Sequence, residues 1–230
     1  MSHSTTYSHD SVMPRVVRLI FWAGFWAVAI VLGFYFVRRD AFKYADWSQA
    51  VYGRFWPNRG LLATHVVGAG VALMIGPLQF VRTLRDRWPR LHRWIGWIYV
   101  VACLGSIPAS LRLSFDSCPL CVSPFVVWAI TTMLVTGLAV VLAILGRHRA
   151  HRDFMIRSYA LMYAFVFVRL DSHLVGTPLE IPLAAGISRS SMVLWLAWVI
   201  PLIVCELILV WLPTVQKALR SRRRRHPAVG

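Results

Sequence analysis

Six long apolar runs follow one another along this chain, and most of its charged residues lie between them. The hydrocarbon core of a bilayer is about 30 Å thick, and an α-helix needs about 20 apolar residues to cross it. The sequence therefore predicts an all-α, polytopic membrane protein with six transmembrane helices. The runs are Leu19–Val37, Leu61–Val81, Trp94–Leu113, Phe125–Leu145, Phe154–His173 and Met192–Leu212.

The composition supports a membrane location. Hydrophobic residues make up 58% of the chain and charged residues 15%, whereas soluble domains have about 45–50% and about 25%. The net charge of +16 would suit nucleic acid. However, the basic residues are grouped between the apolar runs, which is how membrane proteins fix their orientation. We therefore expect a lipid bilayer as the partner and no nucleic acid.

The arginines indicate the orientation. They are concentrated between the second and third runs, between the fourth and fifth, and after the sixth, and such segments stay in the cytoplasm. We expect a protein of the bacterial inner membrane with both termini cytoplasmic. It would have a polar segment 1–18 without a cleavable signal peptide, a transmembrane domain 19–212 and a basic tail 213–230. Segment 38–60 is expected outside, although it is basic too.

A short repeat marks two of the predicted hairpins. A histidine–arginine pair opens the third and the fifth helix, and a tyrosine follows each pair: His92, Arg93 and Tyr99, then His151, Arg152 and Tyr159. Helices two to five would then form a four-helix core of two hairpins, related by a pseudo-twofold axis along the membrane normal. Helices one and six would be peripheral.

One face of the second predicted helix carries small residues in its middle and polar residues at both ends. Its residues, at spacings of three and four, are His65, Gly68, Ala69, Ala72, Gly76 and Gln79. Small residues let membrane helices approach closely, which is one interpretation of this face. The other interpretation is that the small residues leave room for a flat ligand, which the polar ends would hold.

Ionisable residues inside the predicted spans are candidates for function, because charge is costly in hydrocarbon. Arg169 should meet an anion, which could be Asp171, a substrate or a cofactor carboxylate. Glu206 could pair with an arginine of the inner half, and Arg157 lies there. A structural ion pair is the alternative to a functional site in each case.

The histidines suggest haem b, because a membrane haem needs two axial histidines on facing helices and cations for its propionates. The expected iron ligands are His65 with His173 on the outer side, and His92 with His151 on the inner side. This layout resembles the two-haem transmembrane cytochrome b proteins of the ascorbate-dependent ferric reductase type. Further cofactor-binding candidates are the three arginines for carboxylates and two polar neighbours: Arg169, Arg157, Arg152, Gln79 and Tyr99.

Two cysteines, Cys118 and Cys121, lie just before the fourth helix on the outer side. That compartment is oxidising, so they could form a structural disulfide or a redox pair. Their place is similar to that of the paired cysteines in periplasmic disulfide-forming quinone reductases. The other two cysteines, Cys103 and Cys205, lie inside helices, so a second outer pair is missing.

Two segments carry a family resemblance. The first includes Gly76-Pro77-Leu78-Gln79-Phe80 and Leu91-His92-Arg93-Trp94-Ile95-Gly96, and the second spans 151–160. They resemble the bacterial membrane family called domain of unknown function 2306, whose usual Trp is Phe154 here. The resemblance implies a polytopic membrane protein and supplies no activity. It marks as signature positions His65, Gln79, His92, Arg93, His151, Arg152, Arg157 and Arg169.

These observations favour a membrane redox protein that binds haem b or quinone between helices two to five. A non-catalytic accessory or assembly subunit of a larger membrane complex is the alternative from another class. Thiol–quinone exchange at Cys118 and Cys121 is a third hypothesis. The sequence does not identify an enzymatic activity.

Overall fold

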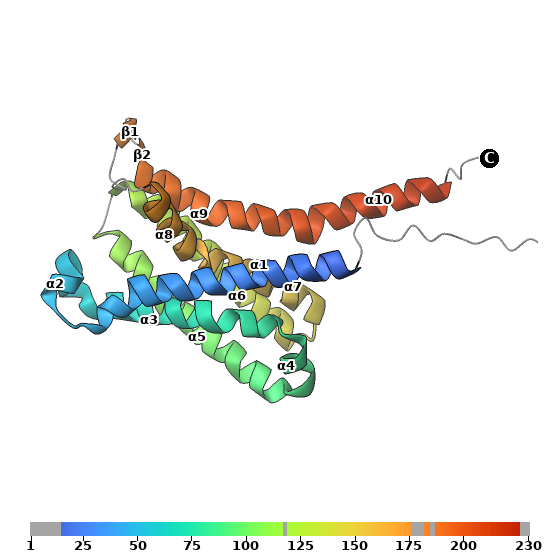
Figure 1. Cartoon of the computed structure of the whole chain (residues 1–230), viewed down its shortest axis with the longest axis horizontal. Helices are drawn as coiled ribbons and strands as arrows, with labels where there is room; N and C mark the ends of the chain where they lie inside the picture. Colours follow the sequence, from blue (N-terminus) through green and yellow to red (C-terminus); the bar gives the residue numbers. More distant parts are fainter. Residues whose placement is uncertain (1–14, 117–118, 176–181, 185–186, 226–230) are drawn as a thin grey trace, which may run out of the picture.

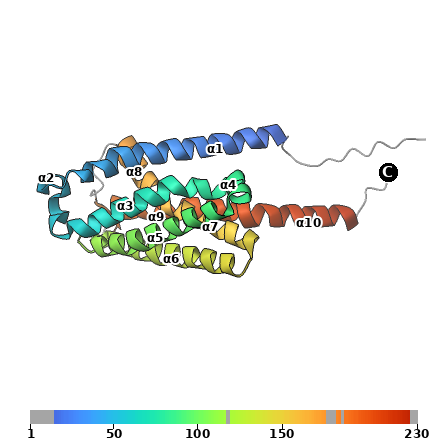
Figure 2. The same ribbon diagram turned by 90° about the horizontal axis from the view of Figure 1, so that it is seen from below.

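A computed structural model of the chain describes residues 15–116, 119–175, 182–184 and 187–225. Within these residues the chain is helical, apart from one antiparallel two-stranded ribbon. The helices lie side by side in a bundle (Figures 1 and 2). The last helix, α10, continues beyond the bundle at the end where α4 lies.

The elements follow the predicted apolar runs, with short helical turns between them. The long helices are α1 (Arg15–Phe36), α3 (Arg59–Ile75), α5 (Pro89–Ser114), α6 (Val122–Ile144), α7 (His148–Met162), α8 (Ala164–Val175), α9 (Arg189–Glu206) and α10 (Leu212–Arg225). The shorter elements are η1 (Val37–Ala41), η2 (Phe42–Ala45), α2 (Gln49–Tyr52), η3 (Gly53–Asn58), η4 (Gly76–Phe80), α4 (Arg82–Arg87), η5 (Pro119–Cys121), β1 (Pro182–Ala184), β2 (Ile187–Ser188) and η6 (Leu207–Trp211).

The helices α3 and α5 pack as the first hairpin, with Gly68 at a close contact between them. A Cβ atom on Gly68 would lie 2.7 Å from the carbonyl oxygen of Ala102 and 2.9 Å from the Cβ of Ser106. Only a residue without a side chain lets the two backbones come this close. This part of the small face of α3 therefore serves helix packing.

The helices α6 and α7 form the second hairpin, and buried hydroxyl groups join it to the first. The Tyr99 hydroxyl is 2.9 Å from Oγ of Ser158, which is 2.7 Å from Oγ1 of Thr136. Trp128 Nε1 donates to the carbonyl oxygen of Leu161 at 2.9 Å. Buried polar groups need such partners, so these bonds help to fix how α5, α6 and α7 pack together.

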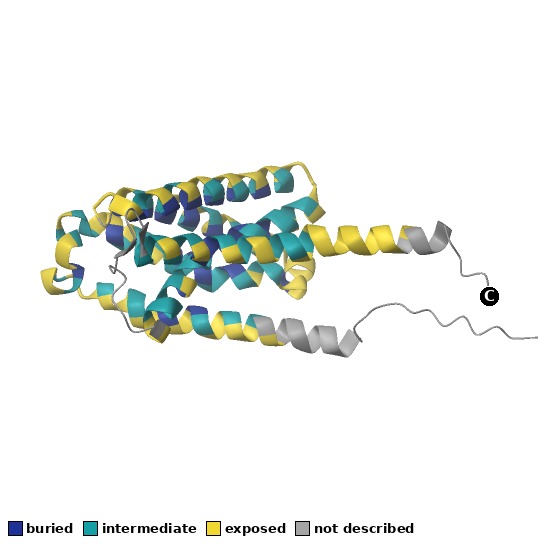
Figure 3. Ribbon diagram, turned by 90° about the horizontal axis from the view of Figure 1, so that it is seen from above, coloured by how far each residue is buried: buried dark blue, intermediate teal, exposed yellow. Residues whose placement is uncertain are grey.

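The helices α1 and α9 flank the two hairpins. Trp26 of α1 contacts the rings of Phe80 and Tyr159, and an ion pair joins α7 to α9. In this pair Arg157 Nη2 donates to Oε2 of Glu206 at 3.0 Å, which confirms the predicted partner of Glu206. The outward faces of the helices are the exposed ones (Figure 3).

Four helical stretches in the described part are long and apolar enough to cross a membrane: Gln49–Phe80, Pro89–Ser114, Pro119–Ile144 and Arg189–Leu219. They correspond to the second, third, fourth and sixth predicted runs. The fifth run, Phe154–His173, is not one continuous helix, because α7 ends at Met162 and α8 begins at Ala164. At the break, the Tyr163 hydroxyl donates to the carbonyl oxygen of Ala29 at 2.6 Å. This contact with α1 is tertiary, so hydrophobicity along the chain does not reveal it.

Candidate functional site

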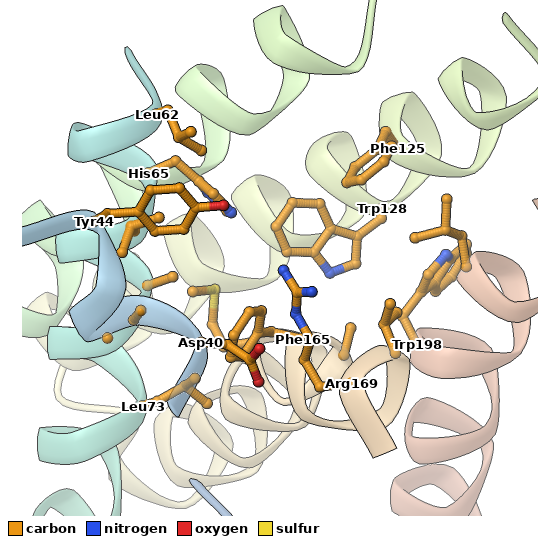
Figure 4. Close-up of a pocket in the computed structure, with 18 of the residues that line it drawn as sticks. Asp40, Tyr44, Leu62, His65, Leu73, Phe125, Trp128, Phe165, Arg169 and Trp198 are labelled. Carbon is orange, nitrogen blue, oxygen red and sulfur yellow. The ribbon is translucent and has the colours of Figure 1, made fainter. Parts of the chain in front are cut away.

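A cavity of about 200 Å³ lies between α3, α6, α8 and α9, with η1 and η2 at one side (Figure 4). We call it the outer cavity, because its residues belong to the half of the bundle that is expected outside. Five aromatic side chains contribute to its walls: Tyr44, Phe125, Trp128, Phe165 and Trp198. Its polar and charged groups are few and come from three parts of the chain: Asp40, Tyr44, His65 and Arg169.

The small face of α3 divides between packing and the cavity. A Cβ atom at Gly76 would collide with the ring of Tyr159, as one at Gly68 would collide with α5. Ala69 of this face, by contrast, lines the outer cavity, as does its neighbour Gly70. Gly68 and Gly76 thus serve packing, and the interpretation that the face leaves room for a flat ligand stays a prediction.

Hydrogen bonds with Ser106 of α5 hold His65 in position. Its Nδ1 is 3.1 Å from both the carbonyl oxygen and Oγ of Ser106, and Ser106 Oγ donates to the His65 carbonyl oxygen at 3.0 Å. A histidine whose Nδ1–H is bonded to a carbonyl presents the lone pair of Nε2 to a further partner. The Ser106 contact therefore leaves the other ring nitrogen available, and the residue lines the cavity.

Arg169 also lines the cavity, and its side chain forms no hydrogen bond or ion pair with a residue that the structure describes. Its guanidinium lies over the Phe165 ring, 5.3 Å from the centroid. The expected partner Asp171 instead accepts from Arg189 at 2.6 Å. Like Arg157, Arg189 is only 13% exposed and has a carboxylate partner. Within the described part, Arg169 thus forms no ion pair.

Asp40, which no sequence pattern singled out, lines the same cavity as Arg169 and is drawn close to it in the view of Figure 4. Its side chain is 13% exposed, and its Oδ2 is buried without a hydrogen bond in the described part. The signal that could have found it is a lone acid directly after the first apolar run. His173 Nε2 lies 3.9 Å from this oxygen, beyond hydrogen-bond distance.

The outer histidines therefore have different surroundings. His65 lines the cavity, whereas the ring of His173 stacks on Phe36 of α1 with centroids 5.4 Å apart. His173 does not belong to the cavity lining. A haem between these two residues stays a prediction.

In the half of the bundle that is expected inside, the structure brings His92 and His151 together as electrostatic neighbours, with Arg85 near them. His151 Nδ1 is 2.8 Å from the carbonyl oxygen of Ala139, while His92 Nδ1 is buried without a partner in the described part. Gln79 Nε2 is 3.4 Å from the His92 carbonyl oxygen.

The remaining predicted site residues lie elsewhere. Arg157 forms an ion pair with Glu206, and the buried Tyr99 hydroxyl is hydrogen-bonded to Ser158. Arg152 is exposed, with Asp153 at 4.0 Å. Among the cysteines, Cys121 is disulfide-bonded, and Cys118 lies outside the described residues.

A comparison with protein families identifies the family of this chain. The family model "Predicted membrane protein (DUF2306)" matches residues 62–209, which is more than half of the 230 residues. No curated protein and no solved structure matches the chain. The matched region contains His65 and Arg169, while Asp40 and Tyr44 precede it. The chain therefore belongs to the DUF2306 family of membrane proteins, as its sequence resemblance predicted.

Proposed function

We propose that the protein binds the ring of a quinone in the outer cavity and takes part in electron transfer in the membrane. The observation that carries this proposal is Arg169, which lines a cavity with aromatic walls and forms no ion pair with a residue that the structure describes. A guanidinium only donates hydrogen bonds, so it suits a quinone carbonyl oxygen. Aromatic side chains pack well against a flat ring. His65 lines the same space, and its Nε2 lone pair can accept a hydrogen bond but cannot donate one to the carbonyl oxygen.

The size of the cavity favours a single ring. Its volume of about 200 Å³ is below the range of about 300–1,000 Å³ for most ligand sites. A quinone ring is small, and its hydrocarbon tail would remain in lipid. A bis-histidine haem needs two axial ligands that face each other, and of the two predicted outer ligands, both of which the structure describes, His65 lines the cavity and His173 does not. The outer site therefore suits a quinone better.

Binding to the full-length protein in detergent tests this proposal. A short-chain benzoquinone should quench tryptophan fluorescence saturably, and equilibrium dialysis should give the same affinity. Arg169→Gln should weaken binding tenfold or more, because hydrogen bonds to charged groups contribute about 1.5–3 kcal/mol. Arg39→Gln is the matched control, since Arg39 is at the same end but bonds to Tyr35 on the surface. The proposal fails if the wild type shows no saturable binding, or if Arg169→Gln binds as tightly. A neighbour that co-purifies with a protein unable to bind quinone would favour the accessory-subunit hypothesis.

A second candidate is haem b between the inner histidines. Its support is the Nδ1 of His92, which is buried without a partner among the described residues. His151 is an electrostatic neighbour of His92, and its own Nδ1 bond leaves Nε2 available. Haem would supply one-electron transfer. Protein purified from haem-supplied cells should then show a Soret band and α and β bands that sharpen on reduction, and His92→Ala should remove them. A colourless wild type would refute this candidate.

We also propose six spans in a bacterial inner membrane, with α1 and the α7–α8 pair added to the four long stretches. The arginine-rich α4 and α10 lie at one end of the bundle, and α2 and the strands lie at the other (Figure 1). This agrees with both termini in the cytoplasm. An impermeant thiol reagent should label Ser48→Cys in intact spheroplasts and Ser221→Cys only after lysis. The reverse pattern would refute the orientation.

A further inference from the structure

We propose that the outer cavity selects the reduced form of its ligand, a hydroquinone, with one hydroxyl donating to Asp40 and the other oxygen accepting from Arg169. This inference rests on the proposed quinone function and adds the redox state that the site prefers. It concerns binding alone, so no bond is broken and no electron is transferred.

Asp40 provides a hydrogen-bond acceptor that lacks a donor. Its Oδ2 is buried and unbonded in the described part, and the His173 nitrogen at 3.9 Å is too far away to donate. A carboxylate oxygen accepts hydrogen bonds and does not donate them. A buried acceptor without a partner is unfavourable. A ligand hydroxyl at this position would supply the missing donor.

Arg169, in contrast to Asp40, needs a hydrogen-bond acceptor from the ligand. Its guanidinium has donors and no acceptor, and it lacks an ion-pair partner among the residues that the structure describes. Arg169 and Asp40 line the same cavity without pairing with each other. Figure 4 draws the Arg169 guanidinium pointing toward Trp128 and the Asp40 carboxylate beside Phe165. Arg169 therefore needs an acceptor from the ligand, and Asp40 needs a donor.

The two redox forms of the ligand differ in just these groups. A quinone has two carbonyl oxygens, which only accept, so one of them would face the Asp40 carboxylate with no hydrogen between the two oxygens. A hydroquinone has two hydroxyl groups, and each can donate or accept. It can satisfy Asp40 and Arg169 together. We expect it to bind at least tenfold more tightly, which would raise the potential of the bound two-electron couple by about 30 mV.

Three probes with the same ring test the inference on the full-length protein under anaerobic conditions: a short-chain benzoquinone, its hydroquinone and the hydroquinone dimethyl ether. The wild type should prefer the hydroquinone over the quinone at least tenfold. The dimethyl ether should bind less tightly than the hydroquinone, because it has no donor. Equal affinity for hydroquinone and quinone, or for hydroquinone and ether, would overturn the inference.

Asp40→Asn is the decisive variant, because its amide can both donate and accept. The ratio of hydroquinone to quinone affinity should fall to about one. Asp116→Asn is the control, since Asp116 is a more exposed acid that already bonds to Asn58 and Arg112, and the ratio should stay unchanged. A ratio that survives in Asp40→Asn would overturn the inference. If this variant fails to fold, the three wild-type affinities still decide.

The two proposals can fail separately. If the wild type binds none of the probes, the quinone function itself is wrong. If it binds quinone and hydroquinone equally and Arg169→Gln weakens both, the quinone function stands and the redox preference is wrong.

Discussion

Gly68→Ala tests the close packing of α3 on α5. The new Cβ would lie 2.7 Å from the carbonyl oxygen of Ala102 and 2.9 Å from the Cβ of Ser106. Ordinary van der Waals contact begins at 3.4 Å, so the helices must separate by about 0.7 Å. The obstacle includes backbone, which cannot rotate away as the end of a flexible side chain can. The hydrogen bonds between His65 and Ser106 lie one turn away and would lengthen as well.

The magnitude follows from a comparison with Gly137→Ala, the matched control. Gly137 lies in α6, and a Cβ atom added there would have no atom within 4 Å. Both changes gain the same helix propensity, about 1 kcal/mol. The difference between them isolates the clash, which should lower the free energy of unfolding by about 1–3 kcal/mol in Gly68→Ala.

The assay is reversible unfolding by sodium dodecyl sulfate in mixed micelles, followed by tryptophan fluorescence and circular dichroism. Gly68→Ala should unfold at a lower detergent fraction than the wild type, and Gly137→Ala at an equal or higher one. If Gly68→Ala is as stable as Gly137→Ala, the backbone contact between α3 and α5 does not exist and the reasoning is refuted.

The other predictions concern contacts in the rest of the bundle. A double-mutant cycle of Arg157→Ala and Glu206→Ala should give a coupling energy of about 1–3 kcal/mol in the same assay, because the two charged groups share hydrogen bonds. A coupling near zero would argue against the ion pair. Tyr99→Phe should lose about 1 kcal/mol of stability, because it removes a buried hydrogen bond, whereas Tyr35→Phe on the surface should change it little. In unfolded, unreduced protein Cys121 should resist alkylation and should react after reduction, as mass spectrometry can measure. Alkylation before reduction would contradict the disulfide.

Some site residues could be predicted from sequence, and others could not. Arg169 and His65 stood out because an ionisable side chain inside an apolar run needs a reason, and both line the outer cavity. His173 met the same criterion, but its ring packs on Phe36 instead. Asp40 was missed because it follows a basic pair outside the first run, where a charged residue needs no explanation.

The sequence by itself determined the membrane class, the family and the positions of the long helices. Whether a segment can span the bilayer depends on its own length and apolarity, and its orientation depends on the basic residues beside it. Both can be read from the sequence of that segment alone. The tertiary structure alone decided the break between α7 and α8, the partners of each arginine and the outer cavity. These depend on which faces of distant helices meet. For example, Arg189 donates to Asp171, and Arg169 lines the cavity instead of pairing with that acid. A pairing of this kind depends on distances in space that spacing along the chain does not contain.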